Sequence, residues 1–153
     1  INAVGRIRAV VNGTCLDYLA ESFMAGDPLH EGGFVVLNGV AFDEDGKLGE
    51  LPSPYPGGNL FSLASGGAIY ARDPRQCLGD DQLNGGAFAA LTAEDWAVVR
   101  PLLEENERRF GIPLRTLLTV DGEEQPPERV YRKIAPSLQK ALMPEEAWVR
   151  KTH

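Results

Sequence analysis

Residues 57–73 have the sequence GGNLFSLASGGAIYARD, in which a glycine turn leads through small residues to a Gly-Gly step and then to a short apolar strand. The same order occurs earlier in the chain, where LDYLAESFMAG, residues 16–26, precedes GGFVVLNG, residues 32–39. The two Gly-Gly steps end at Gly33 and Gly67, which lie 34 residues apart. Such self-similarity is the sequence signature of a repeated supersecondary unit.

The repeat extends more faintly in both directions. Residues 83–88, LNGGAF, resemble a third unit, and residues 7–13, IRAVVNG, resemble the strand and turn of a preceding one. Glycine suits the corners of such units, because the backbone turns there with positive φ or because neighbouring units approach too closely for a Cβ. The pattern therefore predicts a short solenoid of stacked β coils, with a hairpin turned at Asp45-Gly46 in the insert at residues 41–56.

The composition changes near Leu91. The first 91 residues hold 15 of the 17 glycines, whereas residues 92–153 are denser in charge. We therefore predict glycine-rich β coils in residues 1–91 and a helical C-terminal cap in residues 92–153. Thr92 with Asp95 predicts the start of a helix, and Gly111 predicts its end.

The remainder of this cap is predicted in less detail. A second helix is expected from Glu128 to about Leu142, and residues 117–120 followed by Asp121-Gly122 predict a short strand and turn. We expect the first helix to lie across the last coil and to cover its open strand edge. Three aromatic residues at helical sites are assigned to packing: Trp96, Phe110 and Trp148.

Composition argues against several classes of function. The 153 residues carry a net charge of −7, which disfavours nucleic-acid binding because that affinity comes mainly from Lys and Arg. No apolar run approaches the roughly 20 residues needed to cross a bilayer, and no signal peptide is present, so we expect a cytoplasmic location and no membrane partner. The chain begins with Ile1 rather than Met, which leaves open whether Ile1 is a native, processed or truncated end. Its two cysteines form neither a disulfide framework nor a zinc pattern.

Few residues have the pattern of a catalytic or metal site. Cys15, Cys77 and His30 have no neighbour in the sequence that would activate them. Residues 43–46, DEDG, lack the alternating oxygen ligands and terminal glutamate of a calcium loop, and Asp80-Asp81 is only an acidic pair. We therefore assign no catalytic, cofactor-binding or metal-ligating residue to this chain. The alternative, a free-standing enzyme, requires the cysteines, His30 or the acidic pairs to converge in one pocket.

A resemblance to a known family covers most of residues 7–112. Residues 57–73, the Leu83-Asn84 strand and the helix that follows Leu91 and ends at Phe110-Gly111 resemble the C-terminal GXGXG domain of the glutamate synthase large subunit. The earlier unit is similar to the same coil signature. Three residues depart from the pattern where the family often has glycine or methionine: Ala20, Ser22 and Leu63.

The resemblance implies a mainly β fold with C-terminal helices, namely a right-handed parallel β-helix of few coils capped by α-helices. In glutamate synthase this domain holds the glutaminase and the flavin and iron–sulfur synthase domain in fixed relation and carries no catalytic side chains. A related domain forms one of the subunits of formylmethanofuran dehydrogenase, again without the redox chemistry.

The function that the resemblance implies is a non-catalytic structural subunit or domain of a glutamate-synthase-like amidotransferase and oxidoreductase complex. FMN and an iron–sulfur cluster would belong to partner subunits, and no cofactor to this chain. The alternative is a β-helix subunit of another redox or one-carbon complex, similar to formylmethanofuran dehydrogenase. A coil stack needs about three coils to bury its own core, and the N-terminal face of the predicted stack has no capping element. Either upstream residues continue the stack or another subunit docks on that face, and we expect the chain to be a component of a larger assembly.

Overall fold

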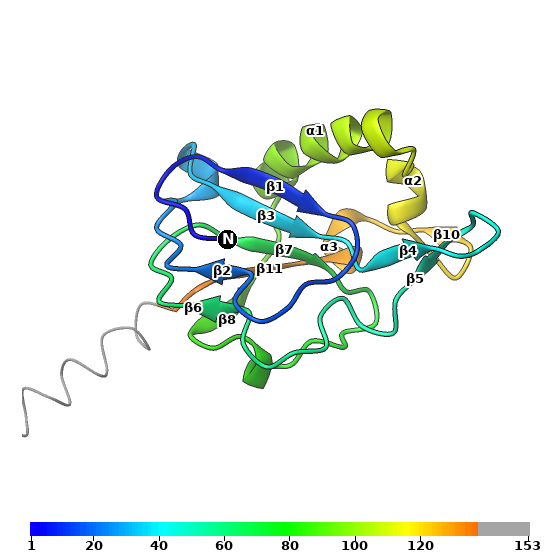
Figure 1. The fold of residues 1–153 in the computed structure, drawn as a ribbon. Helices are drawn as coiled ribbons and strands as arrows, with labels where there is room; N and C mark the ends of the chain where they lie inside the picture. The colour runs from blue at the N-terminus through cyan, green and yellow to red at the C-terminus, as the bar shows by residue number, and fades with distance from the viewer. Residues whose placement is uncertain (138–153) are drawn as a thin grey trace, which may run out of the picture.

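The computed structural model describes residues 1–137, which form a mixed α/β fold around one five-stranded sheet. The strands follow the spatial order β1 (Arg8–Val11), β3 (Phe34–Leu37), β7 (Ile69–Arg72), β11 (Tyr131–Pro136) and β8 (Gly86–Ala89) (Figure 1). The first three strands are parallel, whereas β11 runs antiparallel to both of its neighbours. The sheet therefore combines strands from the glycine-rich region with one strand from the C-terminal region.

Three two-stranded sheets surround the central one. One is a parallel pair and two are antiparallel hairpins. They are β2 (Ala20–Glu21) with β6 (Phe61–Ser62), β4 (Val40–Phe42) with β5 (Leu48–Glu50), and β9 (Thr119–Val120) with β10 (Glu123–Glu124). The turn at Asp45-Gly46 connects β4 to β5, and the turn at Asp121-Gly122 connects β9 to β10. Both turns were predicted from the sequence and are confirmed.

The prediction of a right-handed parallel β-helix capped by α-helices is wrong. The 34-residue spacing does set one local pairing, because Val35 of β3 lies opposite Ile69 of β7 in parallel register. The place beside β7, however, is taken by the antiparallel strand β11, and β8 pairs with β11 rather than continuing a parallel stack. The tail thus supplies a strand that satisfies the free backbone groups of β7, and the result is a mixed sheet.

The two Gly-Gly steps allow close approach between neighbouring segments. A Cβ at Gly33 would lie 2.6 Å from the carbonyl oxygen of Ile7 and 2.8 Å from the Cβ of Ala25. Gly67 has φ +74°, and a Cβ there would overlap the ring of Phe23. Glycine is therefore required at both positions for the reason that the sequence suggested.

Helix α1 (Ala93–Phe110) lies across one face of the central sheet (Figure 1). Its Val99 and Leu103 are buried in a cluster with Phe34 and Tyr70. The prediction that this helix covers an open strand edge is wrong, because it covers the outer face of the sheet instead. Its predicted ends are confirmed: the Thr92 side chain accepts the N–H of Asp95, and Gly111 ends the helix at φ +67°.

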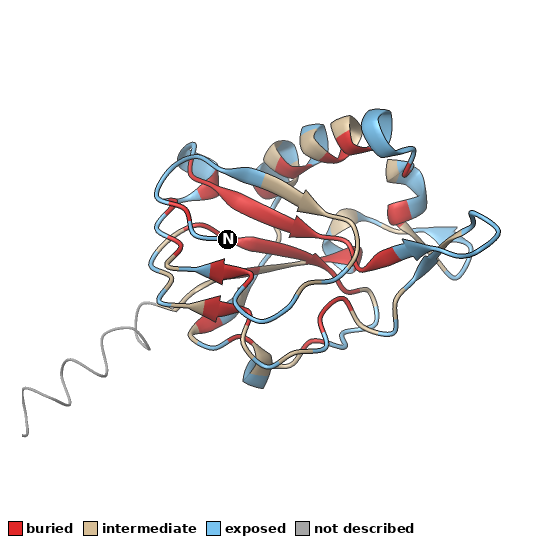
Figure 2. Cartoon of the chain, viewed as in Figure 1, coloured by how far each residue is buried: buried red, intermediate tan, exposed pale blue. Residues whose placement is uncertain are grey.

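The opposite face of the sheet bounds a second core. Val35, Leu37 and Ile69 point into it and pack with apolar residues from β2, β6 and the segments that follow them. Figure 2 shows β3 and β7 buried along their length between these two layers. Both faces of the middle strands are thus covered, which explains why these strands are continuous apolar runs.

The remaining elements are short. They are the 3-10 turns η1 (Pro28–His30) and η2 (Asp80–Gln82) and the one-turn helices α2 (Leu114–Leu117) and α3 (Pro127–Val130). The prediction of a helix that begins at Glu128 is wrong over the described residues, because α3 ends at Val130 and the strand β11 begins at Tyr131. Tyr131 and Ile134 are buried in the two cores. The rest of that predicted helix and Trp148 lie outside the described residues.

A buried ionic network joins α1 to two strands. The Asp95 carboxylate is fully buried, accepts the Tyr70 hydroxyl at 2.6 Å and lies 2.8 Å from the Lys133 ammonium. Burial alone would raise the pKa of Asp95, but hydrogen bonds from Lys133, Tyr70 and Thr92 outweigh it and hold that pKa below its ordinary value. The start of α1 is thereby attached to β7 and β11.

Replacing Ile134 tests the position of β11. Because this side chain is fully buried between the strands, we expect Ile134→Ala to lower the free energy of unfolding by about 2–5 kcal/mol. Urea denaturation at neutral pH measures the change, and Glu123→Ala in the exposed β10 is the control, expected within about 0.5 kcal/mol of the parent. An unchanged Ile134→Ala protein would contradict the placement of β11 in the core.

The Asp95 network predicts a loss of stability in acid. Since the pKa of Asp95 is lower in the folded chain than in the unfolded one, its stabilising contribution is complete above the unfolded pKa of about 3.9 and is lost as the pH falls through the folded pKa. We expect Asp95→Asn to lower stability at pH 7 by about 3–5 kcal/mol, because Lys133 loses its buried partner. The decline of stability from about pH 5 downward should also be shallower in the variant. Urea denaturation across this pH range checks both effects, and parallel curves for the two proteins would contradict the assignment.

Candidate functional site

The structure places the candidate nucleophiles and His30 on separate elements. Cys77 is exposed, and its backbone N–H donates to the Asp73 carboxylate at 2.8 Å. Cys15 is half-buried, and burial raises the pKa of its thiol to about 11, which disfavours the nucleophilic thiolate. His30 lies in η1, where its Nδ1 contacts the Asp27 carboxylate at 2.9 Å. No hydrogen bond or ion pair within residues 1–137 joins one of these three side chains to another.

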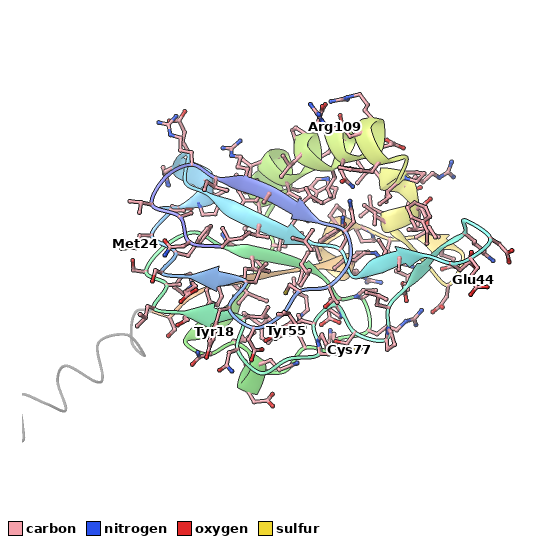
Figure 3. All side chains as sticks on the ribbon, viewed as in Figure 1. Tyr18, Met24, Glu44, Tyr55, Cys77 and Arg109 are labelled. Carbon is pink, nitrogen blue, oxygen red and sulfur yellow. The ribbon has the colours of Figure 1, made fainter. Side chains whose placement is uncertain are left out.

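The acidic candidates stabilise turns. The Asp43 carboxylate accepts the backbone N–H groups of Asp45 and Lys47 at 2.9 and 2.8 Å, which closes the β4–β5 hairpin. Glu44 lies at the tip of that hairpin (Figure 3). Asp80 and Asp81 begin η2. Within residues 1–137 no cluster of three or more His, Cys, Asp or Glu side chains is arranged to hold a metal ion.

A cluster of charged side chains beside Cys77 was missed by the sequence reasoning. Arg72 is buried and donates to Glu50 at 2.9 Å and to the carbonyl of Leu117 at 2.7 Å. Burial opposes the ionisation of Glu50, but Arg72 and Arg75 outweigh it and lower the pKa of that carboxyl. The cavity here has a volume of about 20 Å³, room for about one water molecule. The cluster therefore attaches the β4–β5 hairpin to the end of α2.

The feature of the structure best suited to an interaction is the edge formed by β1. This strand is the first in the order of the central sheet, and within residues 1–137 it pairs only with β3. The carbonyls of Ile7 and Val11 accept N–H groups from the β3 side at 2.9 Å each. Because backbone groups alternate in direction along a strand, those of Arg8 and Val10 face away from β3. They form an open row of donors and acceptors.

A second outer row runs beside β2. The carbonyls of Ile1 and Ala3 each accept a backbone N–H at 2.9 Å, from Glu21 and Met24 respectively. The backbone nitrogen of Ile1 donates to the carbonyl of Leu19 at 2.8 Å. The same initial segment therefore forms the outer row of both layers.

Exposed apolar side chains are concentrated in the first part of the sequence. Of the ten large apolar residues that are exposed within residues 1–137, seven come from the first 29. Leu16 is 89% exposed and Val4 is 72% exposed, and Figure 3 labels Tyr18 and Met24 among the others. We use the name N-terminal edge surface for β1 together with the exposed apolar side chains of the segments before and after it, of which Tyr18 and Met24 lie away from β1 (Figure 3). The side chains are those of Ile1, Val4, Ile7, Leu16, Tyr18 and Met24.

Hydrogen-bonded asparagine side chains position β1. Asn12 and Asn38 follow in-register residues of β1 and β3, and the Asn38 amide donates to the Asn12 side-chain carbonyl at 2.8 Å. Asn106 of α1 exchanges two hydrogen bonds with Asn12, at 2.8 and 2.9 Å. The Tyr131 hydroxyl donates to Asn38 at 2.7 Å. The repeated strand endings VVNG and VLNG, residues 10–13 and 36–39, were the signal from which this network could have been found.

A second network fixes the loop between β1 and β2. The buried Tyr55 hydroxyl donates to the Asp17 carboxylate and accepts the Asn59 N–H at 2.9 Å. The hydrogen bond from Tyr55 lowers the pKa of Asp17, whereas burial and this carboxylate raise the pKa of Tyr55 to about 12. Leu16 and Tyr18, on either side of Asp17, are thereby carried on a fixed loop.

Comparison with known proteins gave no match, whether with protein-family models, with curated proteins or with solved structures. A membrane-spanning helix is also not found in the part of the chain that the structure describes. The functional assignment therefore rests on the geometry above and on the resemblance of the glycine-rich units.

Truncating Asn106 tests the network that holds β1. We expect Asn106→Ala to lower the free energy of unfolding by about 1–3 kcal/mol, because the half-buried Asn12 amide group loses the acceptor and the donor that Asn106 supplies. Guanidinium denaturation measures the change, with the exposed Glu107→Ala of the same helix as the control. Equal stability of the two variants would show that the asparagines do not support the edge.

Proposed function

We propose that this chain is a non-catalytic structural unit of a glutamate-synthase-like amidotransferase and oxidoreductase complex. It holds neighbouring parts of the complex in fixed relation and leaves the chemistry to them. FMN and the iron–sulfur cluster belong to the partner subunits, and the complex is cytoplasmic. The single observation that carries the proposal is the N-terminal edge surface.

This surface combines two features that a free protein normally avoids. An edge strand with unpaired backbone groups pairs readily with another chain, and natural proteins usually shorten, charge or cover such edges. Here β1 has one charged residue, Arg8, and its guanidinium lies over the Phe34 ring, 5.3 Å from the centroid. Leu16 and Val4 add apolar surface that a partner would remove from water.

The rigidity of the surface supports an organising role. The asparagine network fixes β1 against β3 and α1, and Asp17 with Tyr55 fixes the following loop. A preformed surface loses little conformational entropy on binding, so it can hold a partner in one orientation. The resemblance of residues 57–73 to the glutamate synthase GXGXG domain indicates which kind of complex that partner belongs to.

The proposal predicts co-purification that depends on Leu16. The full tagged chain, expressed in its native host, should bring down a partner whose absorption spectrum shows flavin and an iron–sulfur cluster. Leu16→Glu should reduce the recovered partner by about tenfold or more, since a charge must then be buried in the interface. Phe110→Glu, an equivalent change at the 62% exposed end of α1, is the control and should leave recovery unchanged.

Two results would contradict the proposal. A stable, colourless monomer with no partner would remove the structural role. A partner that carries neither flavin nor an iron–sulfur cluster would remove the relation to glutamate synthase. Circular dichroism of both variants confirms that any loss of partner does not come from unfolding.

A further inference from the structure

Two loops lie side by side at the end of the molecule where β2 and β6 end (Figure 1). The Ser22 N–H, after β2, donates to the carbonyl of Ser62 at 2.6 Å. The Ser65 N–H, after β6, donates to the carbonyl of Phe23 at 3.0 Å. These bonds hold the two loops together, so the side chains that they direct outward form one surface.

The described part of the chain ends at the same place. The Asn84 amide donates to the carbonyl of Phe61 at 2.8 Å, which holds the turn before β8 against β6. In that turn the Gly85 carbonyl accepts the N–H of Ser137, the last described residue, at 2.7 Å. Residues 138–153 therefore begin beside the two loops.

Leu63, on the second loop, is placed unfavourably if nothing covers it. Its side chain is 84% exposed. Its φ of +53° is in the left-handed region, where the Cβ of an L-residue comes too close to the following carbonyl oxygen. Asn84, at φ +47° in the next turn, is of a type that tolerates this conformation, whereas leucine is not. A residue that is both strained and apolar at the surface points to a contact that its side chain makes.

A second apolar side chain lies at this end of the molecule. Met24, on the first loop, is 51% exposed (Figure 3). We call Leu63 and Met24 together the exit surface. Met24 also belongs to the N-terminal edge surface, but it lies away from β1.

The C-terminal segment, residues 138–153, has the sequence LQKALMPEEAWVRKTH. Leu138, Ala141 and Leu142 have the i, i+3, i+4 spacing that is typical of one apolar side of a helix. Leu138 follows Ser137 directly, so this apolar group starts next to the exit surface. A segment tethered at such short range has an effective concentration of about millimolar, which favours it over a segment of another protein.

We propose that the C-terminal segment docks on the exit surface of its own chain, with Leu138 and Leu142 packed on Leu63. The contact removes the Leu63 side chain from water and offsets the strain of its backbone. It also closes the end of the layer that β2 and β6 form, whereas the β1 edge stays open for a partner. The proposed function is tested at Leu16, so the two proposals succeed or fail separately.

Nuclear Overhauser effects between methyl groups test the contact directly in the full chain. With labelled leucine methyl groups, we expect cross-peaks between Leu63 and Leu138 or Leu142. A mixture of labelled and unlabelled chains separates contacts within one chain from contacts between two copies. Cross-peaks within one chain support the proposal. Cross-peaks only between chains, which would place a second copy on the exit surface, or no cross-peaks at all would overturn it.

The sign of the effect of Leu63→Asn gives a second test. If the side chain were uncovered, asparagine would relieve the left-handed backbone and the midpoint of urea unfolding would rise or stay unchanged. Under the proposal the substitution removes a buried apolar contact, and we expect the midpoint to fall by about 0.5 M or more. A rise or an unchanged midpoint would contradict the proposal.

A double-mutant cycle locates the contact. We expect the midpoint of Leu63→Asn with Leu142→Asn to fall by clearly less than the sum of the two single shifts, because either change alone breaks the same contact. Phe110→Asn, at the 62% exposed end of α1, is the matched control and should add to Leu142→Asn without coupling. Additive shifts for Leu63→Asn, or equal coupling in both cycles, would overturn the proposal.

Discussion

The central sheet depends on the pairing of β11 with β7. Without β11, the parallel part of the sheet would end at β7 with unpaired backbone groups, whose burial is costly. The antiparallel register places Ile134 opposite Ile69 in one core and Lys133 opposite Tyr70 beside the buried Asp95. One strand from the C-terminal region thereby attaches the glycine-rich region to α1, and the described chain packs as a single unit around that strand.

Buried polar side chains add specificity that the apolar residues alone lack. Val35, Val36 and Leu37 are apolar on both faces of β3, so a slip by one residue would exchange one apolar set for another. Asn12 and Asn38 oppose such a slip, because each finds its hydrogen-bond partners only when β1, β3 and α1 are in the observed register. The same network fixes the position of the open edge, so the internal packing and the interaction surface depend on common residues.

Local features of the fold could be predicted from the sequence, and the global arrangement could not. The ends of α1 at Thr92 and Gly111 and the turn at Asp45-Gly46 depend on neighbouring residues, and their chemistry is visible in the sequence. The pairing of Val35 with Ile69 followed from the repeat, but the strand that lies beyond β7 depends on residues some sixty positions away. Residues 131–136, YRKIAP, lack strict alternation and followed a helix signal, so β11 was mistaken for helix. For the edge surface, the sequence predicted only that the chain belongs to a larger assembly, because exposure of Leu16 and Val4 is a property of the folded chain.

The two edges of the central sheet differ in a way that bears on function. At the β8 edge, the Arg132 guanidinium covers the Phe88 ring, 3.6 Å from its centroid, and the Ser137 N–H donates to Gly85 at 2.7 Å. At the β1 edge, Arg8 is turned onto Phe34 of the neighbouring strand, and the apolar side chains around it remain exposed. An unpaired strand edge with exposed apolar side chains beside it is costly in a protein that functions alone, because such an edge invites unspecific pairing. That cost is removed when a second chain covers β1, and the open edge, rather than any reactive side chain, is therefore what supports the proposed structural role.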